Sequence, residues 1–300
     1  MPVPEAARTT VVIATRNRSE ELCGTLERLF SLPEQPDVIV VDNASTDATP
    51  REVGSRFPAA RLVSLPDNRG AAARTVGARL ARTPWIAFSD DDSWWSAGSL
   101  ERAAACLSRS PRLGLVAARP VIEPDGISDP VVRRMADSPL PRAPRAPGPA
   151  VLGFLACAAV VRRTAYLGVG GFHPLLFLGG EERLLAYDLV AAGWELAYRE
   201  DVVAHHQPSP QRDPLARRAL DLRNQALIGW LRRPVRRALG LTADLARRAT
   251  EERAARRALL SLGAMLPHAL RERSPLPAEV EARVRLLERF EDAEAADGRA

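Results

Sequence analysis

The first 120 residues alternate short apolar runs with helical stretches, and this alternation limits the folds that the chain can adopt. The runs contain almost no polar residues, as in Val-Ile-Val-Val at 38–41. Strands of this kind are buried on both faces, which is typical of a parallel sheet with helices on either side. We therefore predict an α/β fold with strands at 9–14, 37–41, 61–64, 85–89 and 113–118 and helices at 20–32, 71–81 and 100–107.

Polar residues follow three of the predicted strands, at the point where each strand ends. They are Thr15, Arg16 and Asn17 after the first strand, Asp42 and Asn43 after the second, and Asp90, Asp91 and Asp92 after the fourth. In open α/β sheets, ligands bind at the carboxyl ends of the strands. The three clusters therefore predict one functional site at that edge of the sheet.

The three consecutive aspartates have the chemistry of a cation site. Because side chains alternate along an extended chain, Asp90 and Asp92 should point one way and Asp91 the other. Two converging carboxylates suit Mg²⁺ or Mn²⁺, which such sites usually hold together with substrate phosphates. A solvated turn is the alternative for the triplet taken alone, since Asp is common in turns.

The order of these motifs resembles family 2 glycosyltransferases with the GT-A fold, over about residues 9–210. The matching motifs are residues 11–18, residues 40–47, Asn68-Arg69-Gly70 with Arg74, Ser89-Asp90-Asp91-Asp92, Gly170-Gly171-Phe172 with Phe177, Glu181-Glu182 and His205. The resemblance implies a mostly parallel central sheet with helices on both faces. It also implies a metal-assisted, inverting transfer of a hexosyl or deoxyhexosyl group from a nucleotide-sugar to a hydroxyl of a glycan or lipid-linked acceptor.

The resemblance also implies roles for individual residues. The nucleotide part of the donor would be bound by Thr15, Arg16, Asn17, Asp42, Asn43, Asn68, Arg74, Asp90 and Asp91. Arg74 would meet phosphates, because guanidinium geometry suits phosphate oxygens. Asp92, as the direct ligand, and Asp90 would hold Mg²⁺ or Mn²⁺, and His205 would complete the coordination of the cation. For a lone histidine, a packed or surface position is the alternative.

In the family, an acidic residue near Glu181-Glu182 deprotonates the acceptor hydroxyl. Neighbouring residues on a helix diverge by about 100°, so only one glutamate can face the site. The family pattern favours Glu182 over Glu181 as the base. Two departures from that pattern leave open a sugar-nucleotide binder without activity. Leu184 replaces the usual Asp, and the Arg that often follows is absent, with Asp188 nearby instead.

Two other enzyme classes fit the first strand less well. A nucleotidyltransferase would also use a metal and carboxylates, but it needs a Gly-rich phosphate loop, and residues 15–18 contain no glycine. A Rossmann dehydrogenase needs G-x-G-x-x-G after that strand, which is absent.

Three parts follow from the pattern: a catalytic domain at 1–213, a basic helical extension at 214–290 and a disordered acidic tail at 291–300. Seven prolines within 123–150 predict a surface loop beside the site, with a domain linker as the alternative. Further elements are predicted as strands at 151–161, 194–198 and 201–204 and helices at 181–192, 214–230 and 235–262.

The net charge of +5 is concentrated in the extension, where residues 214–273 carry 14 Arg against 5 acids. Residues 1–213 carry 24 Arg against 25 acids, so nucleic acid is not expected as a partner. Basic amphipathic helices favour a peripheral contact with an anionic membrane, and packing or a dimer contact is the alternative. The oligomeric state stays open.

The scattered Cys23, Cys106 and Cys157 predict free thiols in a reducing cytoplasm. The sequence contains neither a stretch of 18 uncharged apolar residues nor an apparent secretory signal. We therefore expect a cytoplasmic protein, with peripheral contact at the inner face of the membrane as an addition.

Overall fold

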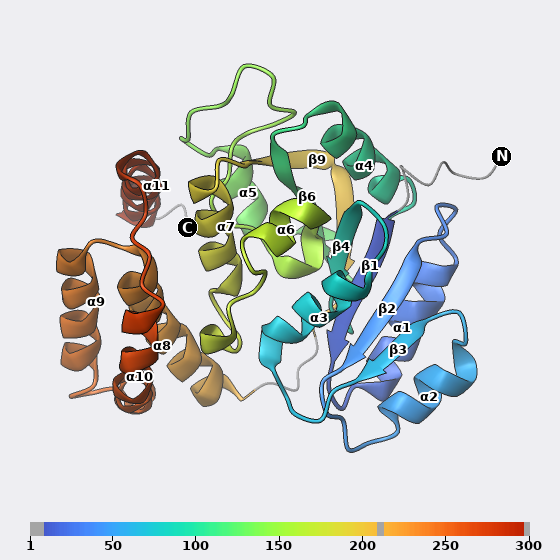
Figure 1. The fold of residues 1–300 in the computed structure, drawn as a ribbon, viewed down its shortest axis with the longest axis horizontal. Coiled ribbons are helices and arrows are strands. Elements are labelled where there is room, and N and C mark those ends of the chain that lie inside the picture. The colour runs from blue at the N-terminus through green and yellow to red at the C-terminus, as the bar shows by residue number, and fades with distance from the viewer. Residues whose placement is uncertain (1–8, 209–212, 297–300) are drawn as a thin grey trace.

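The computed structural model of this chain describes residues 9–208 and 213–296 (Figure 1). In this part, nine strands form one mixed sheet in the order β3-β2-β1-β4-β8-β6-β9-β5, with β7 paired to β6. The strands are β1 (Thr9–Thr15), β2 (Asp37–Asp42), β3 (Arg61–Ser64), β4 (Trp85–Ser89), β5 (Ser93–Trp95), β6 (Leu113–Ile122), β7 (Ile127–Ser128), β8 (Ala159–Arg162) and β9 (Glu195–His206). Strands β3, β2, β1 and β4 are parallel to one another, as predicted.

Helices cover both faces of the sheet, which confirms the predicted α/β fold (Figure 1). Val11 and Ile13 of β1 pack into one core and Val12 into the other, and this explains the continuous apolar runs. The first core is closed by α1 (Ser19–Phe30), α2 (Thr49–Arg56) and α4 (Ser99–Arg109). The second is closed by α3 (Ala73–Leu80), α6 (Arg163–Gly168) and α7 (Glu181–Ala191).

The second half of the chain differs from the predicted elements in several places. Residues 151–161 are not one strand, because the short helix η3 (Ala156–Ala158) precedes β8. The two strands predicted at 194–204 are the single strand β9, which continues to His206 through a bulge in its pairing with β6. The proline-rich segment 123–150 contains β7 and α5 (Val131–Ala136), and Met135 of α5 is buried in the second core.

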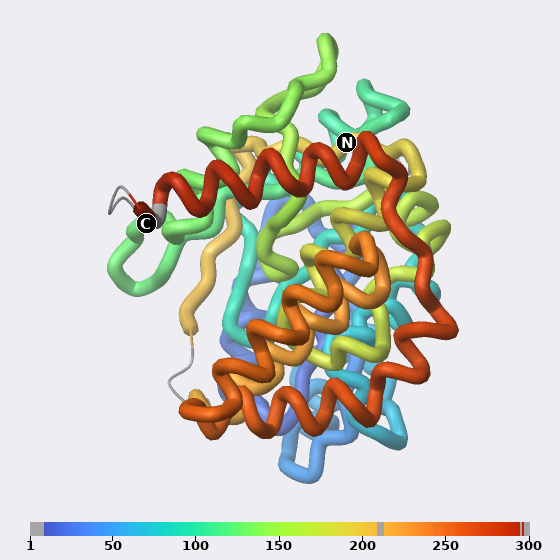
Figure 2. Tube along the Cα trace, turned by 90° about the vertical axis from the view of Figure 1, so that its left-hand side faces the viewer, coloured from blue at the N-terminus to red at the C-terminus, as the bar shows by residue number. Residues whose placement is uncertain are grey.

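The C-terminal helices are α8 (Pro214–Arg232), α9 (Val235–Arg248), α10 (Arg253–Arg271) and α11 (Ala278–Ala296). The single helix predicted at 235–262 is therefore two. Figure 2 views the molecule from the side on which α9, α10 and α11 lie. The disordered tail predicted at 291–300 is wrong for 291–296, which continue α11, while 297–300 lie outside the described residues. Among the helices of residues 9–208 and 213–296, none combines the length and the apolar composition of a membrane-spanning segment.

Helix α8 packs directly against α7 and the loop that precedes it. Leu227 of α8 shares a hydrophobic core with Leu184 and Tyr187 of α7. The side chain of Asn224, which is 1% exposed, donates hydrogen bonds to the carbonyl oxygens of Leu176, Leu178 and Gly179. This segment leads directly into α7, so α8 holds the start of α7 in place.

Arg233, which is 4% exposed, joins the last helix to the others. Its guanidinium group lies 2.7 Å from a carboxylate oxygen of Glu281 and 2.7 Å from one of Glu288, both on α11. Buried charges need such partners, because the loss of one partner leaves the other charge unpaired in a poorly solvated place.

We predict that Arg233→Met lowers the free energy of unfolding by ~3–5 kcal/mol, since it removes the buried cation that Glu281 and Glu288 share and leaves them only the exposed Arg285 and Arg237. Arg247→Met is the matched control, because its ion pair with Asp244 is exposed and should contribute at most ~1 kcal/mol. Urea denaturation measures both variants. An equal, small effect of the two substitutions would show that the buried pair does not anchor α11.

Candidate active site

A hollow of ≈ 460 Å³ opens at the carboxyl ends of β1 and β4, where the sequence predicts the site. Its walls come from those strand ends, from η3, from α7 and from the first turns of α8. The charged and polar residues that line it are Arg16, Arg18, Arg74, Asp90, Asp91, Asp92, Cys157, Glu181, Glu182, His206, Asp213 and Arg217. Seven of these are among the predicted site residues.

Arg74 is the buried cation of this hollow. Its side chain from α3 is paired with Asp90, and the guanidinium carbon lies 5.9 Å from the centre of the Phe172 ring. Burial alone would lower the pKa of Arg74, but Asp90, Glu181 and Glu182 raise it above its usual range. Its Nε atom is buried and has no hydrogen-bond partner in the described ranges. A buried donor of this kind is suited to an anionic ligand.

The three aspartates have three different environments. Asp90 accepts a hydrogen bond from Arg74, whereas Asp91 accepts one from the Thr15 hydroxyl at 3.0 Å. Burial, together with the charges of Asp90 and Asp92, raises the pKa of Asp91 to about 7. Asp92 lies with one carboxylate oxygen 3.4 Å from Nε2 of His206. All three side chains line the hollow, including Asp91.

The donor atoms near Asp92 fit a divalent cation. Ligand atoms of Asp90, Cys157 and His206 lie within 4.8 Å of one another, and Asp92 adjoins His206. Burial raises the pKa of the Cys157 thiol well above its usual range, so this residue stays protonated at neutral pH. The remaining carboxylates and imidazole are ligands that Mn²⁺ accepts, and the carboxylates also suit Mg²⁺.

The prediction that His205 faces the cation is wrong. Both of its ring nitrogens have protein partners, Ser96 at 2.6 Å and Glu123 at 2.7 Å, and its ring stacks on Trp94. Side chains alternate along β9, so His206 points to the opposite side and reaches Asp92. The two histidines are adjacent in the sequence; the resemblance pointed to His205, whereas His206 is the one that lies beside Asp92 and lines the hollow.

Glu181 and Glu182 begin α7, and both line the hollow. Glu181 is 3% exposed and Glu182 is half-buried. Burial, with the nearby charge of Glu181, raises the pKa of Glu182 to about 8, and burial also raises the pKa of Glu181. A carboxylate with a raised pKa is a stronger proton acceptor once it is ionised, as general-base chemistry requires.

The departures from the family pattern at this helix have structural roles. Leu184 is 1% exposed and packs in the core shared with α8. Asp188 pairs with Arg232 of α8 through two contacts of 2.5 and 3.0 Å. Both residues therefore join α7 to the C-terminal helices.

Of the other predicted nucleotide residues, Arg16 alone lines the hollow, and five hold its surrounding loops. The Asn17 side chain accepts a hydrogen bond from the backbone of Thr46, and Asp42 accepts one from Ser45. Asn43 accepts one from the backbone of Arg69 and donates one to Gly70. The remaining two bonds are those from Thr15 to Asp91 and from the Gly70 backbone to Asn68.

Gly70 explains the glycine of the Asn68-Arg69-Gly70 motif. Its backbone has φ +56°, and an added Cβ would lie 2.0 Å from the carbonyl oxygen of Phe177. Ala71 donates a hydrogen bond to that same oxygen at 2.6 Å. Two motifs of the resemblance are thus in direct contact, which only glycine allows.

Sequence reasoning missed several residues of the hollow, namely Arg18, Cys157, His206, Asp213 and Arg217. Arg18 directly follows the predicted cluster Thr15–Asn17, so its place in the sequence was enough to predict that it lies at the site. Arg217 belongs to α8, which the pattern assigned to a separate extension. No local motif connects it to the strand ends.

Comparison with solved structures supports the same fold. The mannosyltransferase PcManGT from Pyrobaculum calidifontis, in complex with GDP-Man and Mn²⁺, superposes with a TM-score of 0.58 at 22% identity, over 96% of this chain and 75% of that chain. S. aureus TarS 1-349, in complex with UDP-GlcNAc, gives a TM-score of 0.60 at 17% identity, over 92% of this chain and 83% of that chain. The fold is therefore of the GT-A type.

Relatives in sequence agree with this result. An N-acetylglucosaminyl-diphospho-decaprenol L-rhamnosyltransferase of Mycobacterium tuberculosis (strain ATCC 25618 / H37Rv) is 30% identical over 296 residues, covering 83% of this chain and 96% of that protein. A pre-mycofactocin glycosyltransferase of the same strain is 34% identical over 227 residues, covering 72% of this chain and 46% of that protein. The family description "Glycosyl transferase family 2" matches residues 10–169. The chain is thus a glycosyltransferase and belongs to glycosyl transferase family 2.

Proposed function

We propose that this glycosyltransferase moves a hexosyl or deoxyhexosyl group from a nucleotide-diphosphate sugar to a hydroxyl of a lipid-linked glycan, with inversion and with a divalent cation. One observation carries the proposal: a single hollow contains Arg74, the Asp90–Asp92 carboxylates with His206, and Glu182. The lipid-linked acceptor is supported by the rhamnosyltransferase relative, whose name gives N-acetylglucosaminyl-diphospho-decaprenol as the molecule that it acts on.

The side chains divide the work of the reaction. Glu182 accepts the proton of the acceptor hydroxyl, whose oxygen bonds to the anomeric carbon while the bond from that carbon to the diphosphate breaks. Arg74 binds the diphosphate, and its Nε, which has no partner in the part of the chain that the structure describes, serves as one donor. Asp92, Asp90 and His206 would hold Mn²⁺ or Mg²⁺, which as a Lewis acid neutralises charge on the departing nucleoside diphosphate. The imidazole favours Mn²⁺ over Mg²⁺.

A sugar-nucleotide binder without activity and a nucleotidyltransferase were the alternatives. The relatives named as glycosyltransferases disfavour both. The interhelix contacts of Leu184 and Asp188 give these two departures a structural role, so the departures are no argument for a loss of activity. A turnover assay with radiolabelled nucleotide-sugars separates an enzyme from a binder, because a binder releases no nucleoside diphosphate.

We predict that Asp92→Ala abolishes transfer and metal-dependent nucleotide binding, whereas Asp91→Ala does less. His206→Ala should weaken nucleotide binding in the presence of Mn²⁺ by at least ~10-fold, since it removes a cation ligand. His205→Ala is the matched control, because its ring nitrogens bind Ser96 and Glu123. Calorimetry with a nucleoside diphosphate and Mn²⁺ measures all four. Loss of binding in the His205 variant alone would overturn the ligand set.

We predict that Glu182→Gln keeps donor binding and lowers turnover by ~10²-fold or more, because the amide cannot accept a proton. Glu181→Gln should have a milder effect. Glu182 can accept a proton only in its ionised form, and its pKa is raised to about 8. Turnover of the unmodified enzyme should therefore increase as pH rises through about 8. The Gln variant should lack this increase. Single-turnover rates between pH 6 and 9 test the assignment, which fails if the Glu181 variant is the inactive one.

We also propose a peripheral contact with a membrane, made by exposed residues of α9 and α10. Many of the extension's arginines are used internally, as Arg232 and Arg233 show. Exposed apolar side chains remain on α9 and α10, with Leu239 53% and Leu260 79% exposed. Exposed arginines accompany them at positions 236, 248, 256 and 257.

We predict that the chain binds anionic vesicles at low salt and that neutralising those four arginines to Gln weakens binding by at least tenfold. Each arginine near an anionic surface contributes ~1 kcal/mol, screened over ~10 Å at 0.1 M salt. Substituting four exposed arginines of the catalytic part removes the same charge as a control, at Arg51, Arg61, Arg82 and Arg109. Equal binding to neutral vesicles in cosedimentation would refute the contact. Truncation before α8 is unsuitable, because α8 lines the active site.

A further inference from the structure

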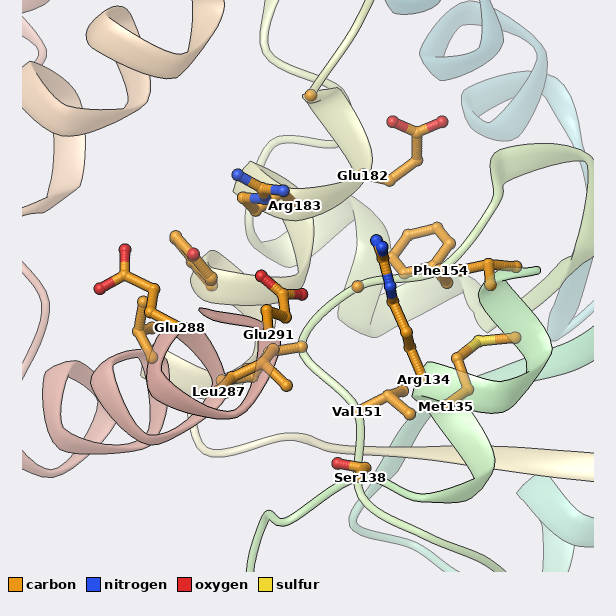
Figure 3. A pocket seen from close by; sticks show the side chains of 16 residues that line it. Arg134, Met135, Ser138, Val151, Phe154, Glu182, Arg183, Leu287, Glu288 and Glu291 are labelled. Carbon is orange, nitrogen blue, oxygen red and sulfur yellow. The ribbon is translucent and has the colours of Figure 1, made fainter. Parts of the chain in front are cut away.

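A second hollow of ≈ 270 Å³ lies beside the active site, between α5, α7, α11 and residues 151–154 (Figure 3). Building on the function proposed above, we infer that it is the acceptor pocket and that Arg134 and Arg183 bind a phosphate or diphosphate ester of the acceptor there. The family match ends at residue 169, whereas α7 and α11 lie beyond it.

The two hollows meet at Glu182, whose side chain lines both. Two segments of the chain also run from one hollow into the other. Phe154 and Gly180 line the second hollow, and their neighbours Leu155 and Glu181 line the first. An acceptor hydroxyl that approaches Glu182 from the second hollow therefore meets a donor sugar held in the first. Transfer needs this arrangement, because reacting atoms must come within ~3–3.5 Å.

Two arginines from separate elements face this space. Arg134 lies on α5 and Arg183 on α7, and both are exposed. In Figure 3 the Arg134 side chain extends toward α7, where Arg183 and Glu182 lie. Within the described part of the chain, no carboxylate forms an ion pair with either arginine. Guanidinium groups bind phosphate oxygens through paired hydrogen bonds, and two of them match the charge of a diphosphate.

Two carboxylates of α11 also line the hollow and indicate on which side the phosphate binds. Glu288 is engaged by Arg233 at 2.7 Å and by Arg237 at 3.2 Å. Glu291 shares the same helix and would repel a phosphate that approached α11 (Figure 3). The phosphate therefore binds on the side of α5 and α7, where both arginines lie.

Apart from Ser138 and the hydroxyl of Tyr187, the other side chains of the wall are apolar. Met135, Phe154 and Tyr187 are each at most 5% exposed, and Val284 and Leu287 of α11 complete the surface. A hollow that combines apolar side chains with converging polar groups is typical of a site for an organic ligand. It suits a sugar ring and the first carbons of a lipid chain better than a free inorganic ion.

The test measures binding of N-acetylglucosaminyl diphosphate that carries a short alkyl chain, by calorimetry. Arg134→Gln and Arg183→Gln should each raise its Kd by ~10–100-fold, since each removes a charge-assisted contact. The Kd for nucleotide with Mn²⁺ should stay unchanged. Arg133→Gln is the control, because it lies on the same helix but does not line the hollow. Glu291→Gln should bind at least as tightly as the unmodified chain.

Several outcomes would overturn the inference. The arginine variants could bind the diphosphate ligand as tightly as the unmodified chain does. The unmodified chain could bind the alkyl glycoside that lacks the diphosphate as tightly as the diphosphate ligand, or it could bind neither. Donor turnover, measured as release of nucleoside diphosphate, separates these failures from a failure of the proposed function. An enzyme that turns over donor while the arginine variants bind normally has its acceptor site elsewhere, whereas no donor turnover at all contradicts the function itself.

Discussion

The ion pair between Arg74 and Asp90 is the interaction on which the active site depends. Several carboxylates line one hollow, and like charges at close range disfavour ionisation unless a cation compensates them. Arg74 is buried among them and interacts with Asp90, Glu181 and Glu182 together. It thereby connects the end of β4 to the start of α7. Among the described residues, the Nε atom of the same guanidinium has no hydrogen-bond partner, so in the proposed function Arg74 both stabilises the site and binds the diphosphate.

The C-terminal helices complete this site rather than extend it. Asn224 and Arg223 of α8 bond to the carbonyl oxygens that precede α7, and Arg217 reaches the hollow itself. Helix α11 in turn is held by Arg233 and lines the second hollow. Arginine in this region therefore has two uses. Buried groups lock helices together, and only the exposed remainder is available to a membrane surface.

The sequence was informative where a single local pattern decides the structure. Apolar runs buried on both faces predicted β1, β2 and β4, and the polar residues after them lie at one edge of the sheet, as expected. It was less informative where the outcome depends on phase or on distant packing. Adjacent His205 and His206 cannot be told apart without the strand pairing that places Trp94 opposite His205. Likewise, Asn17, Asn43 and Asn68 belong to the family motifs, yet their side chains form hydrogen bonds within the surrounding loops. The sequence around Arg217 contains no motif that predicts its contact with the strand ends.

The most direct test of the site is the position of the cation. Crystals grown with a nucleoside diphosphate and Mn²⁺ can be measured by anomalous diffraction at the manganese edge. We expect one peak between Asp92 and His206, with the diphosphate bound beside Arg74. A peak beside His205, or a diphosphate bound away from the ends of β1 and β4, would contradict it.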